Sequence, residues 1–114
     1  MANTFKLINN AVMPGSAGTP DQLYIVAADK TTVVLGLTLC NVHTAQVTVT
    51  VKINNNESTD ILSILLKDAP IPVGGSLEVM SGNKIVLETT DSILVDCSVA
   101  DKVSATMSIM EIDT

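Results

Sequence analysis

The sequence predicts an all-β fold: a single-domain antiparallel β-sandwich, jelly-roll-like or immunoglobulin-like, over residues 1–114. Short apolar runs recur along the chain with clusters of Gly, Asn, Asp, Pro and Ser between them, which is typical of strands joined by turns. No stretch has the length and period of a long helix. Apolar residues make up 46% of the chain and aromatic residues 2%, so the core must be built from Val, Ile, Leu, Met and Ala, and branched side chains of this size suit packed sheets.

The first half of the chain contains four expected strands, at 4–8, 23–28, 32–42 and 45–54. The segment VMPGSAGTPDQ separates the first two, and its two glycines and two prolines favour an irregular loop near 13–22. The clearest alternation is QVTVTVKI, in which Val47, Val49 and Val51 share one face while Thr48 and Thr50 share the other. This alternation predicts a strand with one buried face.

The second half contains five more expected strands, at 60–67, 76–80, 84–88, 93–99 and 103–112. Pro70 and Pro72 each lack a backbone donor, so we expect the segment around them to lie at a sheet edge or to form an extended spacer between strands. Gly74 and Gly75 then permit a sharp turn, and the sequence SGNK predicts a tight turn that pairs 76–80 with 84–88 as a hairpin. Alternation puts Leu77 and Val79 on one face with Glu78 opposite, and Ile85 and Leu87 on one face with Val86 opposite.

The two cysteines are predicted to be free thiols on different faces. In DSILVDCSV, the apolar face comprises Ile93, Val95, Cys97 and Val99, so Cys97 belongs to the core. In TVVLGLTLCNV, the stronger apolar face comprises Val33, Leu35, Leu37 and Leu39, which puts Cys40 on the opposite side. Two free thiols also agree with the cytoplasmic synthesis that the N-terminal sequence MANTFKLINN, which has no signal-peptide pattern, leads us to expect.

Few residues are candidates for chemistry. His43 is the only histidine and is expected in a turn between two strands, where it lacks the partners that a metal site or a hydrolytic triad requires. The carboxylates Asp91, Asp96 and Asp101 recur along neighbouring segments but do not form a calcium-loop pattern, so we expect an acidic surface. We therefore expect no enzyme activity, no catalytic residue, no metal and no cofactor.

The charge of the chain bears on its partners. The net charge is −6 and the pI is about 4.4, so a nucleic-acid backbone or an anionic membrane would repel the protein. The sequence also has no apolar stretch of membrane-spanning length. Nucleic acid and membrane are therefore not expected partners.

The sequence LLKDAPIPVGGSLEVMSGNKIVLETTDSILVDCSVADKVSATMSIMEI resembles the C-terminal half of small virion structural proteins of tailed bacteriophages, of the marine and cyanobacterial type. Those proteins have a KD-P-P-G-SL-V--G-KIVLE-GD-I-V pattern before a closing strand that ends in S-ME. The segments VVLGLTLCNV and VTVTVKI extend the resemblance to about residues 31–112. It implies a virion subunit and carries over no catalytic or binding residue. Many relatives have Gly before the Asp, whereas this chain has Thr90 before Asp91, which leaves the type of that turn open.

Apolar residues are also expected on faces that point away from the core. They are Val34 and Val42 in 32–42, Ile61 and Leu65 in 60–67, and Met110 and Ile112 in 103–112. Exposed apolar patches of this kind mark protein interfaces, unless a loop or the N-terminal segment covers them. Our candidate interface residues are Ile61, Leu65, Met110 and Ile112.

These observations favour a non-enzymatic structural subunit of a tailed-phage virion, such as a capsid decoration or cement protein or an accessory protein of the neck or tail. Its partners would be other virion proteins (capsid, neck or tail) and further copies of itself. It would be synthesised in the host cytoplasm and reside in the virion. The alternative is a carbohydrate-binding β-sandwich module for host-surface attachment. Such modules stack sugars on aromatic rings, and here only Phe5 and Tyr24 are available.

Overall fold

The computed structural model describes residues 3–55, 61–80 and 83–113, apart from the side chain of Ile61. The described residues form nine strands and confirm the all-β prediction. The strands are β1 (Asn3–Met13), β2 (Asp21–Ile25), β3 (Lys30–Asn41), β4 (Val47–Asn55), β5 (Ile61–Ile71), β6 (Ser76–Glu78), β7 (Ile85–Leu87), β8 (Ser92–Cys97) and β9 (Val103–Asp113). The irregular loop expected near 13–22 corresponds to residues 14–20, between β1 and β2.

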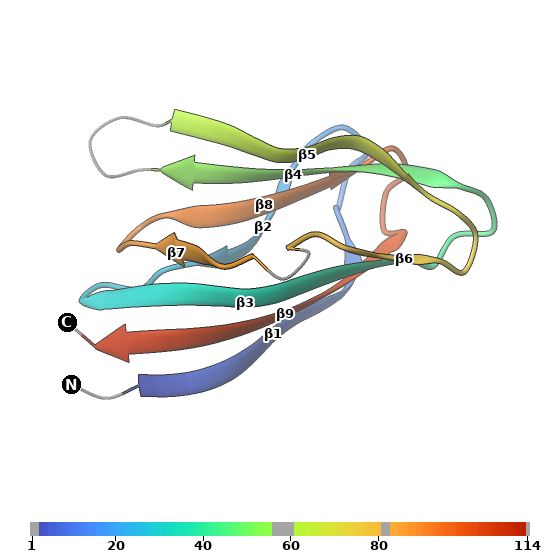
Figure 1. The fold of residues 1–114 in the computed structure, drawn as a ribbon. Coiled ribbons are helices and arrows are strands. Elements are labelled where there is room, and N and C mark those ends of the chain that lie inside the picture. The colour runs from blue at the N-terminus through green and yellow to red at the C-terminus, as the bar shows by residue number, and fades with distance from the viewer. Residues whose placement is uncertain (1–2, 56–60, 81–82, 114) are drawn as a thin grey trace.

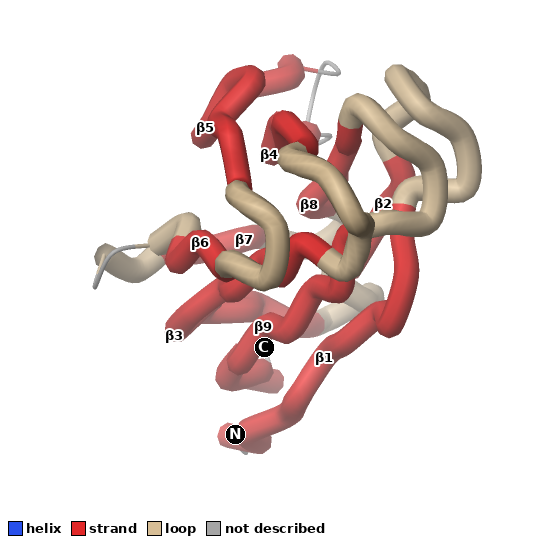
Figure 2. The backbone as a smooth tube through the Cα atoms, turned by 90° about the vertical axis from the view of Figure 1, so that its right-hand side faces the viewer, coloured by secondary structure: helices blue, strands red, loops and turns tan. Residues whose placement is uncertain are grey.

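The strands form two antiparallel sheets that pack face to face, as Figures 1 and 2 show. One sheet has the order β1-β9-β3, with both β6 and β7 on the far side of β3. The other has the order β2-β8-β4-β5. The predicted two-layer sandwich is therefore correct.

The pairing order distinguishes between the two sandwich types left open by the sequence. β4 pairs with β5, β3 with β6 and β7, β2 with β8, and β1 with β9, so the antiparallel pairs are nested around the β4–β5 hairpin. Two further contacts, β3 with β9 and β4 with β8, join these pairs into the two sheets. A double-sheet fold wrapped in this way is a jelly roll, in which β6 and β7 together occupy one strand position.

The core lies between the inner faces of the sheets and is built almost entirely from aliphatic side chains. In β4 the inward residues are Val47, Val49 and Val51, as the alternation of this segment predicted. In β9 they are Val103, Ala105, Met107 and Ile109, each 0% exposed. Cys97 is buried in the core from β8, whereas Cys40 is half-buried on the other face of β3, and both are free thiols as expected.

The prediction for β3 is wrong over its first half because of a β-bulge. Val34 pairs with Ile109 and Gly36 pairs with Ser108, so Leu35 is an extra residue that shifts the register. Inward residues are therefore Thr32 and Val34 before the bulge, and Leu37 and Leu39 after it. Val34, which strict alternation assigned to the outer face, is fully buried, while Val33 and Leu35 are only half-buried.

The hairpin predicted between 76–80 and 84–88 is also wrong. β6 pairs with β3 at Thr38–Cys40, and β7 pairs with β3 at Thr32–Val34, so the two short strands lie one after the other along the same edge. Their face assignments are nevertheless correct, since Leu77 and Leu87 point inward and Val86 is 60% exposed. Pairing with the long strand β3 provides both segments with backbone partners that they would otherwise have to find in each other.

The proline segment follows the edge prediction but is not a spacer. β5 continues through Pro70, which lies opposite Thr48, and ends at Ile71. β5 is an edge strand, so a missing donor is tolerated there. The turn predicted at the two glycines begins at Pro72, whose carbonyl accepts a bond from the N–H of Gly75 at 2.9 Å, and Gly74 has a φ of 70°.

The turn before β8, whose type the sequence left open, contains Thr90 at a position that usually holds Gly. The N–H of Asp91 donates to the carbonyl of Glu88 at 3.0 Å, and the Asp91 carboxylate accepts a bond from the N–H of Glu88 at 3.0 Å. Thr90, the third residue of this turn, has a φ of 72°, whereas Thr89 is not among the positive-φ residues. This is the pattern of a type II turn, which favours Gly at the third position, and a β-branched residue is strained there.

We expect Val49→Asp to destabilise the fold by at least about 4 kcal/mol, because an unpaired carboxylate would be buried on an inner strand. Chemical denaturation measures the effect. Thr106→Asp, on the exposed outer face of β9, is the matched control and should cost less than about 1 kcal/mol. Equal stability of the two variants would contradict the assignment of the β4 inner face.

We expect Thr90→Gly to stabilise the protein by about 1 kcal/mol, because relief of the positive-φ strain exceeds the added entropy of the unfolded chain. Thr89→Gly should have the opposite sign, because Thr89 has no such strain to relieve and its hydroxyl donates to the carbonyl of Lys30 at 2.9 Å. Thermal unfolding of the two variants tests this, and a lower melting temperature for Thr90→Gly would refute the strain.

Candidate functional site

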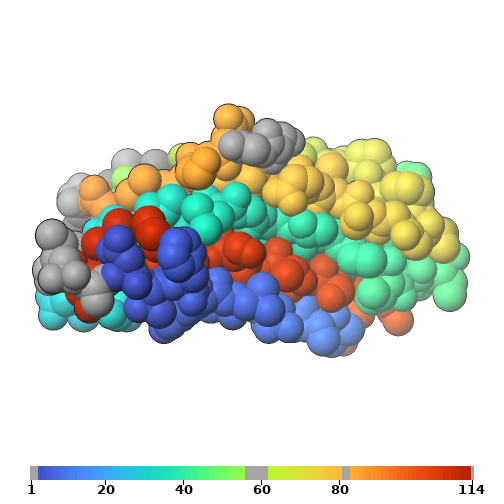
Figure 3. All heavy atoms as spheres, turned by 60° about the horizontal axis from the view of Figure 1, so that its bottom comes forward, coloured from blue at the N-terminus to red at the C-terminus, as the bar shows by residue number. Residues whose placement is uncertain are grey.

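The outer face of the β1-β9-β3-β7 sheet carries a continuous apolar row. Phe5 of β1 pairs with Met110 of β9, Met110 pairs with Val33 of β3, and Val33 pairs with Val86 of β7. Directly paired residues point to the same side of a sheet, so one apolar side chain from each of four strands lines up across this face. Figure 3 views this sheet, with β1 in blue, β9 in red, β3 in teal and β7 in orange side by side.

We call these four residues, with Leu7 and Ile112 beside them, the outer apolar row. Phe5, Leu7 and Val86 are 72%, 62% and 60% exposed, and the other three are half-buried by their neighbours. The exposed part of the row is on the order of 400 Å2, which is the size of patch that commonly has a function. The rest of this face is more polar, with Thr106, Ser108 and Glu78 at its surface.

The structure separates the four interface residues predicted from the sequence. Met110 and Ile112 both lie in the outer apolar row and face away from the core, as expected. Leu65 lies on β5 in the other sheet and is 39% exposed, beside the more exposed Leu62 and Ile64. The side chain of Ile61 lies outside the described part of the structure. Whether any of the four contacts a partner stays a prediction.

Sequence reasoning missed Phe5, Leu7 and Val86 as surface members of this row. Part of the row can be predicted from the sequence, because alternation in 84–88 makes Val86 the outward residue of that segment. What was missing is the cross-strand register, which brings residues 5, 33, 86 and 110 into one line. A register between segments that are distant in the chain cannot be derived from the period of each segment alone.

A buried polar cluster lies on the inner side of the same end of the sheet. The hydroxyl of Tyr24 donates to the Glu111 carboxylate at 2.7 Å and shares a 2.7 Å hydrogen bond with the Thr32 hydroxyl. The Lys6 ammonium forms an ion pair with Glu111 at 2.9 Å. Tyr24, Thr32 and Glu111 are all buried, so these groups satisfy one another away from water.

The cluster changes the acidity of its members. The pKa of Tyr24 is raised to about 12, mainly by burial, while the hydrogen bond with Thr32 opposes this rise and the neighbouring Glu111 adds to it. The bonds from Lys6 and Tyr24 lower the pKa of Glu111 below its ordinary value, since they stabilise the carboxylate. Glu111 therefore stays charged and Tyr24 neutral over the physiological pH range. The cluster joins β1, β2, β3 and β9 through its hydrogen bonds and ion pair.

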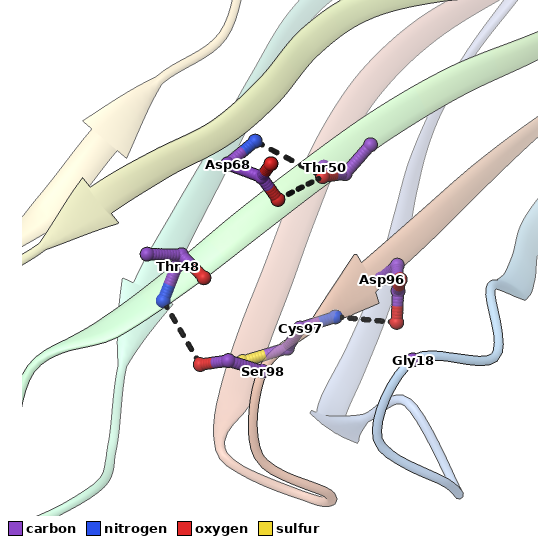
Figure 4. Close-up of a pocket in the computed structure, with 7 residues that line it drawn as sticks. All are labelled: Gly18, Thr48, Thr50, Asp68, Asp96, Cys97 and Ser98. Carbon is purple, nitrogen blue, oxygen red and sulfur yellow. Dashed lines mark hydrogen bonds between the residues drawn. The ribbon is translucent and has the colours of Figure 1, made fainter.

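A shallow polar pocket of about 160 Å3 lies on the other sheet, shown in Figure 4. Its lining residues are Gly18, Thr48, Thr50, Asp68, Asp96, Cys97 and Ser98. The Thr50 hydroxyl accepts a bond from the N–H of Asp68 at 3.1 Å, and Ser98 accepts one from the N–H of Thr48 at 3.1 Å. The Asp96 carboxylate accepts a bond from the N–H of Cys97 at 2.8 Å. These bonds hold neighbouring backbone segments in place.

The other residues considered for chemistry lie apart. Asp96 lines the pocket, Asp91 is buried in its turn, and Asp101 is exposed in the turn before β9. No group of three or more His, Cys, Asp and Glu residues is arranged to hold a metal in the described ranges 3–55, 61–80 and 83–113. Over the same ranges, the structure contains no helix that could span a membrane.

His43 lies in the connection between β3 and β4, as predicted, and its neighbour Asn41 has the structural role there. The Asn41 amide donates to the carbonyls of Ala45 and Ile71 at 3.0 and 2.9 Å, and its oxygen accepts the N–H of His43 at 2.7 Å. Asn41 is 2% exposed, and its hydrogen bond to Ile71 joins the ends of β3 and β5 across the two sheets. The sequence shows no sign of the bond to Ile71, because that carbonyl belongs to a segment 30 residues away.

The sequence matches no protein-family model and no curated protein. Among solved structures, the chain is similar to a protein of the infectious bursal disease virus particle, at 12% identity and a TM-score of 0.60, over 96% of this chain and 30% of that one. It is also similar to a protein of virus-like particles of the Macrobrachium rosenbergii extra small virus (8% identity, TM-score 0.52, 100% and 81% coverage). A third similar structure is that of Bacillus endospore appendages, which form disulfide-linked pili (12%, 0.55, 98% and 87%).

At these identities the similarities show a shared fold and nothing finer. The chain spans less than a third of the matched bursal disease virus protein, and most of the other two proteins. The jelly roll, one of the two sandwich types left open by the sequence, is therefore supported both by strand order and by comparison with solved structures.

We expect the pKa of Tyr24 to govern stability at alkaline pH. The folded state keeps its proton up to about pH 12, whereas the unfolded chain releases it near pH 10, so this contribution is complete below pH 10 and is lost as pH rises toward 12. Tyr24 is the only tyrosine, so tyrosinate absorbance reports its titration directly. A folded-state pKa near 10 would contradict the buried cluster.

The variant Tyr24→Phe provides the control. It should lose about 1–2 kcal/mol at pH 7, because Glu111 keeps only its Lys6 partner, and the part of the alkaline stability loss that belongs to Tyr24 should disappear. Denaturant titrations at several pH values between 8 and 11.5 measure both effects.

Proposed function

We propose that this chain is a non-enzymatic structural subunit of a tailed-phage virion, which attaches to other virion proteins through the outer apolar row. The row is the observation that carries the proposal, because it aligns apolar side chains of four strands on one outer face, with Phe5 and Val86 largely exposed. The bacteriophage resemblance of residues 31–112 and the fold shared with virus-particle proteins support the same class of function. Capsid decoration or cement, and an accessory position at the neck or tail, are the roles that we propose.

The forces at such an attachment can be compared. Covering on the order of 400 Å2 of apolar surface contributes several kcal/mol at about 25 cal/mol per Å2. Repulsion between exposed like charges on an acidic protein is smaller and is screened at physiological salt. The contact should therefore be apolar in character and should resist salt.

The carbohydrate-binding alternative has little structural support. Tyr24, one of the two aromatic residues, is buried and its hydroxyl is bonded to Glu111 and Thr32. Phe5 remains as an exposed ring, and it belongs to the apolar row rather than to the polar pocket. Sugar sites pair an aromatic platform with polar groups beside it.

The first test is mass spectrometry of purified phage particles, in which the protein should be present at a constant ratio to the capsid protein. Washing with 1 M salt should leave it on the particle. Absence from purified particles would refute the proposal, and release by moderate salt would show that the contact is electrostatic.

The second test is a pair of variants. Val86→Lys with Met110→Lys places one charge at the β7 end of the row and one inside the row, and should abolish incorporation while the protein stays folded. Leu62→Lys with Ile64→Lys changes two side chains on the other sheet, whose exposures of 54% and 52% are close to the 60% of Val86, and this variant should be incorporated normally. Normal incorporation of the first pair would place the contact elsewhere.

A further inference from the structure

The four sheet edges differ in how well they are protected against pairing with another strand. Natural edges are blocked by prolines, charges, bulges or short length, because an open edge offers unpaired N–H and C=O groups to other chains. β5 has Pro70, Lys67, a positive φ at Asp68 and two register shifts opposite β4. β2 has five residues and a register shift, and β6 and β7 have three residues each.

β1 lacks these protections along most of its length. From Asn3 to Asn10 it keeps an unbroken register with β9, and this segment contains no proline and one charged residue. That residue is Lys6, and its ammonium is held by Glu111. The irregular end comes only after Asn10, whose side-chain oxygen accepts the N–H of Val12 at 3.2 Å. Within the described residues, β1 pairs on one side only, with β9.

The distribution of charge indicates which partner suits this edge. All 12 Asp and Glu residues lie outside β1, the first of them being Asp21. A basic partner would be attracted to the acidic remainder of the molecule, whereas an identical acidic chain would be repelled there and meet least repulsion at β1. Among the described edges, β1 combines a lack of acidic residues with a lack of protection, so it is suited to a second copy of the same acidic chain.

We propose that β1 joins two copies of this protein, with the Asn3–Asn10 edges of two β1 strands paired antiparallel about a two-fold axis. Two antiparallel strands of one sheet keep the same sides, so the outer apolar rows of both copies would face the same way and meet at Phe5 and Leu7. Pairing of this length covers on the order of 1,000 Å2 in total, at the low end for specific interfaces, so we expect a concentration-dependent dimer.

This inference rests on the proposed function, because a subunit that attaches through its outer apolar row would gain from a second row in continuous register. A dimer would present twice the apolar surface to the particle and bind with two attachment points. The pairing itself can be measured on the purified protein without any particle.

The experiment is sedimentation velocity of the purified protein over a dilution series, together with hydrogen exchange of the β1 amides. The wild type should form dimers, and exchange over 3–10 should become slower as concentration rises. Leu7→Lys with Asn9→Lys places like charges on the same face of both edges and should weaken the dimer at least about tenfold. Because both side chains are exposed, the melting temperature should not change.

Two control pairs separate this edge from the other surfaces. Val86→Lys with Met110→Lys, and Leu62→Lys with Ile64→Lys, should leave the dimer intact. A monomeric wild type at all concentrations would overturn the inference, as would a dimer whose β1 amides exchange independently of concentration. Loss of the dimer in the β5 pair but not in the β1 pair would also overturn it. None of these results depends on incorporation into particles, so the proposed function stands or fails separately.

Discussion

The structure depends on the insertion of the last strand between the first and the third. β9 pairs with β1 from Asn3 to Met13 and with β3 from Lys30 to Asn41, so one sheet exists only when both ends of the chain have met. The inward side chains of β9 from Val103 to Ile109 fill the middle of the core. Its outward side chains Met110 and Ile112 complete the apolar row. Core and candidate interface are thus opposite faces of one strand. Pairing between such distant segments carries a large loop-closure cost and is characteristic of slowly folding β proteins.

Buried polar groups at the two ends of the sandwich select the register of these strands. Glu111 meets Tyr24 and Lys6 at one end, and Asn41 meets the carbonyls of Ala45 and Ile71 at the other. A slip of β9 by one residue would move Glu111 to the outer face and leave the Tyr24 hydroxyl without its carboxylate. The aliphatic core discriminates strongly against a one-residue slip, which would turn polar side chains inward, but weakly against a two-residue slip, because Val, Ile and Leu can replace one another at small cost. Directional bonds add the discrimination that the core lacks.

The surface combines an overall negative charge with the outer apolar row and with a β1 edge that has no acidic residue. A net charge of −6 keeps copies apart over most of their surface, which disfavours indiscriminate association. The outer apolar row and the open β1 edge lie next to each other, since Phe5 and Leu7 belong to both. The two contacts that we propose, through the outer apolar row and through the β1 edge, would therefore lie side by side on the molecule.

The sequence by itself determined the strands and most of their faces, because period-two burial and turn residues act locally. The segments β4, β8 and β9 alternate as their residues predict, and Cys97 and Cys40 lie on the expected sides. Only the tertiary structure decided what depends on a distant partner. Leu35 is a bulge residue only because of how β3 pairs with β9. The short strands β6 and β7 both pair with β3 and not with each other. Tyr24 is hydrogen-bonded to Glu111, which lies 87 residues away in the chain. Alternation tells which residues share a face of one strand, but hydrogen bonding between strands decides which faces become neighbours.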